Sequence, residues 1–375
     1  MPEAWKTYHP AGRHRVLVTR ELLGDRWLRI LTEADCRVEV HTGEKALTSH
    51  ELMSAFAPGC SGLIGQLAES MTAEIFQAFK RAHGVVYSNY AVGYNNVDVP
   101  AASALGIAVG NTPGVLTGAT AELAVALTFA AARRVVEADT FTRQGRFTGW
   151  GLRMFLGELL HGKTLGVVGL GRIGGAYARM LVQGQRMNLM YLSRVRKPEF
   201  EHESSVFNTF LRQSGETPVT VRRAESIEDL LRSADVVGLF PSLNESTRHL
   251  ITADRLKIMR PNAILINASR GPVIDEAALV AHLQIHPDFR AGLDVYEHEP
   301  DLTPGLADLP NVILMPHIGS GTGWTREAMA VIAARNVAAV LQGFPPWGGP
   351  DISVFLADTV PNAAPSIVNA SELPE

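Results

Sequence analysis

The stretch "VVGLGRIGGAYA", residues 167–178, decides the fold of this chain. It places Gly169, Gly171 and Gly174 in the pattern G-x-G-x-x-G, directly after an apolar run and at the start of a helical pattern. The first glycine permits a tight turn, the second lets the backbone approach a pyrophosphate, and the third lets the helix pack close to the strand. The N-terminus of that helix offers free N–H groups and partial positive charge to phosphates. A tight turn without a ligand is the alternative, but the strand-to-helix setting favours a dinucleotide.

The rest of the chain alternates between apolar runs of strand length and helical patterns. After the glycine loop, the apolar runs cover residues 189–193, 235–242, 263–269, 291–296 and 312–318, with helical patterns such as 225–233 and 275–284 between them. Before it, the runs 15–20 and 62–66 are separated by polar helical stretches. Residues 84–99 form a strand that continues into a loop rich in glycine and asparagine, and 106–113 form another strand. Continuous apolar strands that alternate with helices are typical of a parallel sheet with both faces covered. The sequence therefore predicts an α/β fold, with a doubly wound parallel sheet around the glycine loop and a smaller α/β domain.

Three segments connect or extend these domains. The alanine-rich residues 119–144 predict one long helix that serves as a rigid connector. A helical pattern over 324–342 would return the chain to the first domain, and the proline-rich tail after it would be irregular. Residues 194–224 are polar and mixed in charge, which indicates a solvated insert whose beginning lies at the adenosine end of the dinucleotide.

The composition excludes several classes of protein. The chain has 375 residues, 46% of them hydrophobic and 19% charged, with a net charge of −4. This length suggests two domains, and the small charge gives no indication of nucleic acid or of an acidic membrane surface as a partner. The two cysteines, Cys36 and Cys60, are too few for a disulfide framework and are not spaced as metal ligands, so we expect a reducing compartment. The start of the chain lacks a secretory signal pattern, and the longest apolar run, 123–132, is shorter than the about 20 residues that span a bilayer.

The stretch "MYLSRVR", residues 190–196, indicates which dinucleotide is preferred. A carboxylate is expected about 20 residues after the glycine loop, where it would bind the adenosine ribose 2′-OH. Here Ser193 occupies that place, followed by Arg194 and Arg196. Serine can donate a hydrogen bond to a 2′-phosphate, and arginine matches phosphate with a charged fork. The sequence therefore favours NADP(H) over NAD(H), although the arginines could instead only solvate the insert.

Three side chains follow later apolar runs and suit the reduction of a 2-keto acid. They are Arg270 in "INASRGPVID", Glu299 in "GLDVYEHEP" and His317 in "MPHIGSG". The carboxyl ends of parallel strands share one edge of the sheet, so the three side chains can meet there. Arginine can hold a carboxylate and polarise a carbonyl, histidine can protonate the new alkoxide, and a glutamate can orient the histidine. Each residue alone has a simpler interpretation as a surface ion pair, a loop acid or a buried histidine, but the combination behind a dinucleotide loop favours catalysis.

These motifs carry a family resemblance. The segments "GLGRIG", "NASRGPVIDEAAL", "GLDVYEHEP" and "PHIGSGT" resemble, in this order, the signatures of the D-2-hydroxyacid dehydrogenase family. The segments "SNYAVGYNNVDV", "GIAVGNTPGVLT", "TAELA", "AAARRVVEAD" and "PSIVNAS", together with the insert, are most similar to its plant-type hydroxypyruvate reductase subgroup. The resemblance runs from about Arg15 to the C-terminus. It implies a Rossmann-type cofactor domain, residues 118–324, and a discontinuous flavodoxin-like substrate domain, residues 1–117 and 325–375.

The resemblance also implies roles for individual residues. Arg270 would bind the substrate carboxylate and polarise the carbonyl, Glu299 would pair with His317, and His317 would be the general acid. The backbone N–H groups of Ala91, Val92 and Gly93 would bind the same carboxylate. The other residues expected at the cofactor are Pro241 and Thr247 on the adenosine side, Asp294 at the nicotinamide amide, and Arg172, Ile173, Ala268 and Gly319. The mechanism needs no metal ion.

We therefore expect an enzyme that reduces hydroxypyruvate to D-glycerate with NADPH, and glyoxylate to glycolate more weakly. The alternatives are another 2-keto acid as substrate, or an NAD(H)-responsive transcriptional co-regulator without turnover. Family members are usually homodimers, built through the cofactor domains and the long helix. Plant peroxisomal relatives typically carry aspartate at position 193 and end in S-K-L, whereas this chain ends in "SELPE", so the expected location is the cytoplasm. Gln66, Trp150 and Trp324 are candidates for the walls of the substrate pocket.

Overall fold

The computed structural model describes residues 5–373, which divide into two compact units. Unit 1 comprises Met1–Leu116 and Ser320–Glu375, and unit 2 comprises Thr117–Gly319. Residues 1–4 and 374–375, which are the outer ends of the predicted domain 1–117 and 325–375, lie outside the described residues.

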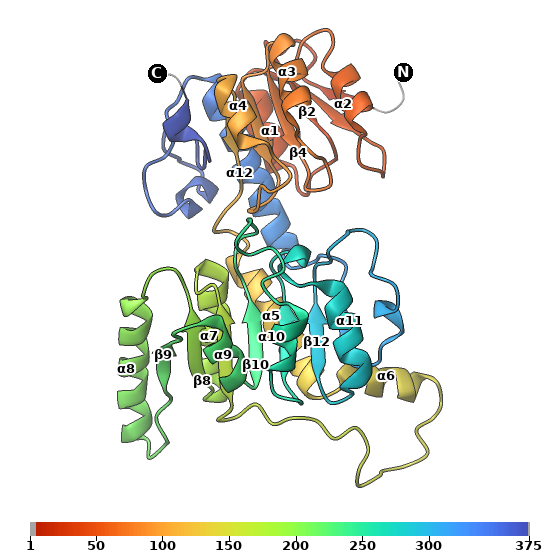
Figure 1. The fold of residues 1–375 in the computed structure, drawn as a ribbon. Coiled ribbons are helices and arrows are strands. Elements are labelled where there is room, and N and C mark those ends of the chain that lie inside the picture. Colours follow the sequence, from red (N-terminus) through yellow and green to blue (C-terminus); the bar gives the residue numbers. More distant parts are fainter. Residues whose placement is uncertain (1–4, 374–375) are drawn as a thin grey trace. The chain divides into compact units, whose positions relative to one another are not determined.

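Unit 2 is built on a seven-stranded parallel sheet with the order β13-β12-β11-β10-β7-β8-β9 (Figure 1). Its strands are β7 (Thr164–Val168), β8 (Asn188–Leu192), β9 (Val221–Arg223), β10 (Val236–Leu239), β11 (Ile264–Asn267), β12 (Arg290–Leu293) and β13 (Val312–Leu314). The direction of strand order reverses at β7, which is the Rossmann arrangement that the sequence predicts. The strand that opens the glycine loop thus lies beside the topological switch point of the sheet.

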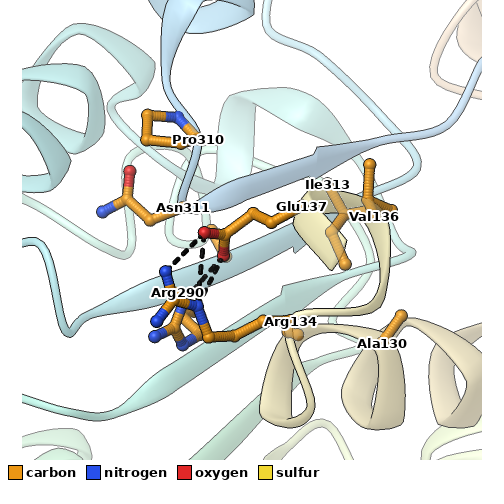
Figure 2. A pocket seen from close by; sticks show the side chains of 10 residues that line it. Ala130, Arg134, Val136, Glu137, Arg290, Pro310, Asn311 and Ile313 are labelled. Atoms are coloured by element: carbon orange, nitrogen blue, oxygen red, sulfur yellow. Dashed lines mark hydrogen bonds and ion pairs between the residues drawn. The ribbon is translucent and has the colours of Figure 1, made fainter. Parts of the chain in front are cut away.

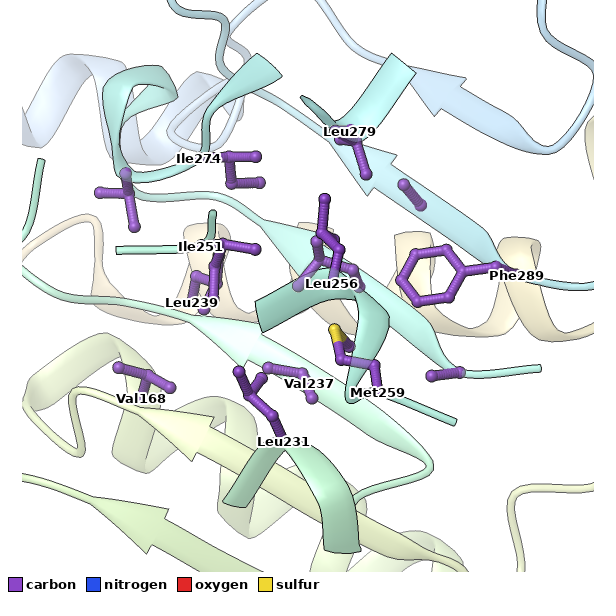
Figure 3. Close-up of a cluster of buried hydrophobic side chains, with 14 of the residues drawn as sticks. Val168, Leu231, Val237, Leu239, Ile251, Leu256, Met259, Ile274, Leu279 and Phe289 are labelled. Atoms are coloured by element: carbon purple, nitrogen blue, oxygen red, sulfur yellow. The ribbon is translucent and has the colours of Figure 1, made fainter. Parts of the chain in front are cut away.

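Helices cover both faces of this sheet. They are α5 (Thr117–Ala132), α6 (Val135–Arg143), α7 (Arg172–Gln185), α8 (Pro198–Gln213), α9 (Ile227–Ser233), α10 (Ala253–Lys257) and α11 (Glu276–Ile285), with the 3-10 turns η1 (Gly271–Val273) and η2 (Leu306–Asp308). Neighbouring residues of one strand enter opposite cores, because side chains alternate along a strand. Val236 packs with α5 and α7, whereas Val237 packs with α9, α10 and α11 in the core that Figure 3 shows. The sheet is therefore buried on both faces, and the residues available to bind a ligand lie on the loops that connect its strands and helices.

Unit 1 contains a six-stranded sheet with the order β1-β3-β2-β4-β5-β6 (Figure 1). Its strands are β1 (Trp5–Tyr8), β2 (His14–Val18), β3 (Cys36–His41), β4 (Gly62–Gly65), β5 (Val86–Asn89) and β6 (Ala108–Gly110). Only β1 is antiparallel to its neighbour, and the other five strands have the flavodoxin-like order that was expected. The helices are α1 (Arg26–Glu33), α2 (Ser49–Ala55), α3 (Ala73–Arg81), α4 (Val99–Ala104) and α12 (Gly323–Leu341), with the 3-10 turns η3 (Ser353–Leu356) and η4 (Ala370–Glu372). Helix α12 packs on α1 and on the central strands, and the tail after it is irregular apart from its short turns, as predicted.

The prediction of one helix over residues 119–144 is wrong. Helix α5 ends at Ala132, Arg134 adopts a left-handed backbone with φ of 53°, and α6 begins at Val135. The break lets Glu137 accept ion pairs from Arg134 (Nη2–Oε2, 2.7 Å) and from the buried Arg290 (Nη1–Oε1, 3.1 Å), as Figure 2 shows beside a small pocket. No glycine or proline marks this turn, so the sequence gives no stop signal.

The sequence interpretation also missed three strands. Strand β3 falls in a stretch predicted to be helical, and its Glu39 is buried between the guanidinium groups of Arg15 and Arg37, both 2.7 Å away. Strand β1 was not predicted, and β9 lies in the polar insert 194–224, which also forms α8. All three strands carry charged residues that obscure a strand pattern. Within residues 5–373, no helix is long and apolar enough to cross a membrane.

Candidate functional site

The predicted site residues of unit 2 lie on loops at the carboxyl ends of its strands. His317 follows β13, Glu299 and Asp294 follow β12, Arg270 follows β11, Pro241 and Thr247 follow β10, the glycine loop follows β7, and Ser193 follows β8. Since these strands are neighbours in one parallel sheet, residues far apart in the sequence share one edge.

The glycine loop has the geometry that a dinucleotide requires. Gly169 has a φ of +91°, and a Cβ atom there would lie 2.7 Å from the carbonyl oxygen of Phe240, on the loop after β10. A Cβ atom on Gly174 would lie 2.3 Å from the carbonyl oxygen of Gly169, so only glycine lets α7 pack this close. Gly171 is the N-cap of α7, with open space where its Cβ would point, and Arg172 and Ile173 form the first turn. The exposed backbone at a helix N-terminus can therefore receive a pyrophosphate.

The corner after β8 gathers polar groups, and position 193 itself carries a serine in place of an acid. The Ser193 hydroxyl donates to the carbonyl of Val195 (2.6 Å), and the side chain of Arg194 is exposed. Arg223, from the edge strand β9, donates from Nη2 to the carbonyls of Ser193 (2.9 Å) and Arg194 (3.3 Å). The sequence interpretation did not include Arg223, because its strand was not recognised. Its guanidinium adds positive charge at the place where the 2′ substituent of the adenosine ribose is expected.

Arg196 is engaged differently from the prediction. Its guanidinium forms an ion pair with Glu201 on α8, with Nη2 2.5 Å and Nε 2.9 Å from Oε2. The Tyr191 hydroxyl also donates to Glu201 (2.6 Å) and accepts from the backbone N–H of Lys197 (3.1 Å). Arg196 therefore shares its charge with a carboxylate, which leaves Arg194 and Arg223 as the more available cations of this corner.

Arg270 is held at the end of β11 by its own neighbours. Asn267 donates from Nδ2 to the carbonyl of Arg270 (2.9 Å) and accepts at Oδ1 from the backbone N–H and hydroxyl of Ser269. The Arg270 guanidinium donates from Nη1 to the carbonyl of Ser269 (2.7 Å). Burial lowers the pKa of Arg270, and the negative charge of Glu299 opposes this shift, so the two groups act on each other.

Glu299 and His317 meet as a hydrogen-bonded pair. His317 Nδ1 lies 2.8 Å from Glu299 Oε2, and the other oxygen of Glu299 accepts from the backbone N–H of Tyr296 (2.9 Å). Burial alone would raise the pKa of Glu299, but the bond and charge of His317, the Tyr296 N–H and the charge of Arg270 together lower it. An ionised carboxylate fixes Nδ1 of the imidazole and leaves Nε2 to act on another molecule. About a third of each side chain is exposed (32% for His317 and 35% for Glu299), so the pair is accessible.

The remaining predicted cofactor residues surround the glycine loop and the histidine. Asp294 accepts from the backbone N–H groups of Ile318 (2.7 Å) and Gly319 (2.8 Å), and burial outweighs these bonds and raises its pKa. Asp294 therefore fixes the segment that carries His317. The others are Pro241, whose nitrogen lies beside Gly169, Thr247, whose hydroxyl donates to the carbonyl of Ser242 (2.7 Å), and the buried Ala268.

Residues 91–93 of unit 1 form a loop with all three carbonyls turned toward the protein. The carbonyl of Ala91 accepts from the N–H of Thr112 (2.8 Å), that of Val92 from Nδ2 of Asn111 (2.8 Å), and that of Gly93 from Nδ2 of Asn89 (2.9 Å). The prediction that Ala91 offers its N–H is wrong, because this group donates to the carbonyl of Asn89 (2.7 Å). Within residues 5–373, the N–H groups of Val92 and Gly93 have no hydrogen-bond acceptor. Two adjacent N–H groups without protein acceptors are suited to a carboxylate.

The three candidate wall residues are in different environments. Gln66 follows β4, and its N–H donates to the buried carboxylate of Glu69 (2.8 Å). Trp150 is 83% exposed in the segment after α6, and Trp324 is 66% exposed in the first turn of α12. Within residues 5–373, no group of three or more histidine, cysteine or acidic side chains is arranged to hold a metal ion.

Comparison with known proteins places the chain in a family. Residues 125–319 match the NAD-binding domain of the D-isomer specific 2-hydroxyacid dehydrogenases. The chain is 51% identical to the glycerate dehydrogenase of Cucumis sativus over 99% of its own length and 98% of the relative's. It is 50% identical to the peroxisomal glycerate dehydrogenase of Arabidopsis thaliana, over 99% and 97% of the two chains.

Solved structures support the same assignment. The NADPH-dependent glyoxylate/hydroxypyruvate reductase of Sinorhizobium meliloti, solved with NADP and malonate, is 30% identical and has a TM-score of 0.71 over 89% of this chain and 95% of that chain. A protein of Thermus thermophilus is 41% identical, with a TM-score of 0.76 over 88% and 97% of the two chains. The family and the resemblance to the plant enzymes that the sequence predicts are confirmed, and the protein is an oxidoreductase that belongs to the D-isomer specific 2-hydroxyacid dehydrogenase family.

Proposed function

We propose that this chain reduces hydroxypyruvate to D-glycerate, and glyoxylate to glycolate more weakly, with NADPH as the preferred cofactor. The observation that carries the proposal is the Glu299–His317 pair (2.8 Å) next to the charge of Arg270, on the same sheet edge as the glycine loop. The names of the relatives, glycerate dehydrogenase in plants and glyoxylate reductase in several archaea, support the choice of substrates.

Each residue of the site has a chemical task in this proposal. The reduced nicotinamide, when bound, supplies the hydride. Arg270 holds the keto-acid carboxylate and polarises the carbonyl. In unit 1, the N–H groups of Val92 and Gly93 are suited to bind a carboxylate. His317 donates the proton from Nε2 to the carbonyl oxygen, and Glu299 holds Nδ1 of the imidazole so that Nε2 is left for this transfer. Unit 2 is thus the cofactor domain and unit 1 the substrate domain.

The glycine loop and the loops around it would hold the cofactor. Gly169, Gly171 and Gly174, with the first turn of α7, receive the pyrophosphate. Ser193, Arg194 and Arg196 face the 2′-phosphate, and the absence of an acid at position 193 supports NADPH over NADH. The ion pair of Arg196 with Glu201 means that Arg194 and Arg223 supply most of the charge. Pro241, Thr247, Ala268, Asp294 and Gly319 line the rest of the cofactor.

A homodimer through unit 2 is part of this proposal. Residues 135–159 expose several large apolar side chains, namely Val135, Val136, Phe147, Trp150, Leu152, Leu156 and Leu159. A concentration of exposed apolar residues on one segment is typical of a protein interface. The segment follows α5, the helix through which family members are expected to pair.

The test compares kcat/KM for hydroxypyruvate with NADPH and with NADH, for the wild type and for Ser193→Asp. We expect the wild type to prefer NADPH and the variant to shift the ratio toward NADH by about 10-fold or more, because a carboxylate repels the 2′-phosphate. Ser205→Asp adds the same charge on the exposed side of α8 and should leave the ratio unchanged. A wild type that prefers NADH would refute the assignment of the corner, and no turnover with either cofactor would refute the substrate.

A further inference from the structure

Unit 2 contains a second histidine–carboxylate pair close to the first. His249, on the loop after β10, has Nε2 2.5 Å from Oε1 of Glu297, on the loop after β12. Glu297 precedes Glu299 by two residues, so the two pairs share one loop. The proposed chemistry assigns no task to His249 or to Glu297.

Hydrogen bonds hold both the carboxylate and the backbone N–H of Glu297. Its side chain is only 9% exposed, and its Oε2 accepts from the N–H of Glu276, the first residue of α11 (3.3 Å). In return, the carboxylate of Glu276 accepts from the N–H groups of Glu297 (3.0 Å) and Thr303 (3.0 Å). These reciprocal bonds tie the loop after β12 to the N-terminus of α11.

The backbone near His249 runs along the segment that follows Arg270. The N–H of His249 donates to the carbonyl of Pro272 (2.7 Å), and that of Ile251 donates to the carbonyl of Val273 (3.0 Å). On the other side, a Cβ atom on Gly271 would lie 1.8 Å from the carbonyl oxygen of Tyr296. The turn after Arg270 is therefore enclosed between the loop of His249 and the loop of Glu299.

The charge balance makes His249 the principal partner of Glu297. Burial raises the pKa of Glu297, but the hydrogen bond and charge of His249 and the N–H of Glu276 more than offset this and lower it. The charge of His298 contributes less to this lowering, and Arg248 is 3.6 Å away and more than half exposed. Without His249, a nearly buried carboxylate would lose its strongest bond, and the loop would rearrange to reach water.

We propose that His249 is a positioning residue for the reaction. By holding Glu297, it clamps the loop of Glu299 against the turn of Arg270 and so sets the distance between Glu299 and His317. The inference rests on the proposed roles of Glu299 and His317, which the experiment below tests separately. A small displacement of a catalytic group is enough to lower turnover about 100-fold.

The test uses two substitutions at His249, whose φ of 48° is in the left-handed region that asparagine tolerates. His249→Asn keeps this backbone but is too short to reach Glu297, whereas His249→Gln retains a donor of similar reach. We expect His249→Asn to lower kcat about 10–100-fold, with the KM for the cofactor changed by less than about 3-fold. His249→Gln should recover most of kcat, which a loss of folding alone would not explain.

Controls separate this effect from misfolding and from failure of the proposed function. All rates are normalised to the fraction of protein that binds the preferred nicotinamide cofactor, so that a loss of folded enzyme is not counted. His161→Asn removes an exposed ring that makes no hydrogen bond within residues 5–373, and should stay within about 2-fold of wild type. A normalised His249→Asn enzyme with wild-type kcat, or a reduced kcat that His249→Gln does not recover, would overturn the inference. Full activity of a His317→Asn enzyme would instead overturn the proposed function.

Discussion

In unit 2, Arg270 and Glu299 are held in part by residues three positions away, whereas in unit 1 residues 91–93 are held in part by segments that are far apart in the sequence. In unit 2, Glu299 accepts from the N–H of Tyr296, and Asn267 bonds the carbonyl of Arg270, each three residues away. In unit 1, Asn111 bonds the loop and itself accepts from the hydroxyl of Ser366 (2.6 Å), 255 residues later.

The centre of the unit 1 network is Asn336 on α12. Its Nδ2 donates to the carbonyl of Asn111 (3.0 Å) and to the hydroxyl of Ser88 (3.3 Å), and its Oδ1 accepts from the N–H of Ser366 (2.9 Å). Asn336 and Ser88 are fully buried, while the Glu299–His317 pair is partly open. We therefore expect a substitution in the Glu299–His317 pair to change the reaction rate with little effect on stability. A substitution in the buried network of unit 1 should change both.

The largest effect on the reaction rate is expected for a substitution of His317 in unit 2. His317→Asn removes the acid but tolerates the left-handed φ of 53° at this position. We expect kcat to fall about 10²–10⁴-fold. The free energy of unfolding should change by less than about 1 kcal/mol, because the side chain is partly exposed. Steady-state kinetics measures the fall in kcat, and thermal melting measures the change in stability. A large loss of stability would contradict the expected difference between unit 2 and unit 1.

A buried amide of unit 1 should show the opposite behaviour. Asn336→Ala leaves Ser88, Asn111 and Ser366 with unpaired polar groups in the core, so the free energy of unfolding should fall by about 2–4 kcal/mol. Denaturant titration measures the loss. Asn208→Ala, which removes two bonds to Val219 beside the edge strand of unit 2, should cost less than about 1 kcal/mol. An equal loss of unfolding free energy in Asn336→Ala and Asn208→Ala would contradict the expected difference between the two units.

Acid should affect unit 2 through a buried histidine. Burial and the neighbouring His286 lower the pKa of His282 from 6.5 to about 4. Between these values the unfolded chain binds the proton more tightly, so the stability present above pH 6.5 is lost as the pH falls toward 4, by about 1–3 kcal/mol. His282→Leu should reduce this loss, as measured by hydrogen exchange of α11 at pH 7 and pH 4.5. The exposed His161→Leu should have the wild-type response, and an identical acid response of His282→Leu would refute the assignment.

The smallest effect tests how the network of unit 1 reaches the loop. Ser366→Ala removes one bond to Asn111, which then holds the carbonyl of Val92 less firmly. The KM for hydroxypyruvate should rise about 3–10-fold with little change in kcat, since one neutral hydrogen bond contributes about 1 kcal/mol. Ser353→Ala, which removes an exposed bond to Asp351, is the matched control and should not alter KM. A fall in kcat alone would indicate that the loop acts on the chemical step.

The parts of the fold and site that were predictable depend on short segments of sequence. The glycine loop, Arg270, Glu299 and His317 each directly follow an apolar strand, and a parallel sheet brings such positions to one edge. The contact of Glu299 with His317 could be anticipated for this reason. The doubly wound parallel sheet and a smaller α/β domain were predicted from the alternation of strands and helices, whereas the flavodoxin-like order of the smaller sheet was implied by the family resemblance.

The parts that were not predictable depend on partners that are distant or on turns without a signal. Nothing in the sequence shows that Glu201 would take the charge of Arg196, or that His249 would find Glu297 across 48 residues. The break at Arg134 has no glycine or proline, and Arg223 was hidden because a three-residue polar edge strand resembles a loop. Tertiary contacts, and not local preference, decided each of these cases.

The closeness of Gly271 to the carbonyl of Tyr296 limits how this enzyme can be altered by directed evolution. No side chain larger than hydrogen fits at 1.8 Å from that oxygen, so a library that randomises residue 271 should return glycine alone. Variants with new substrate preferences should therefore carry their substitutions in the loops of unit 1. The turn after Arg270 and the loop of Glu299 should remain unchanged.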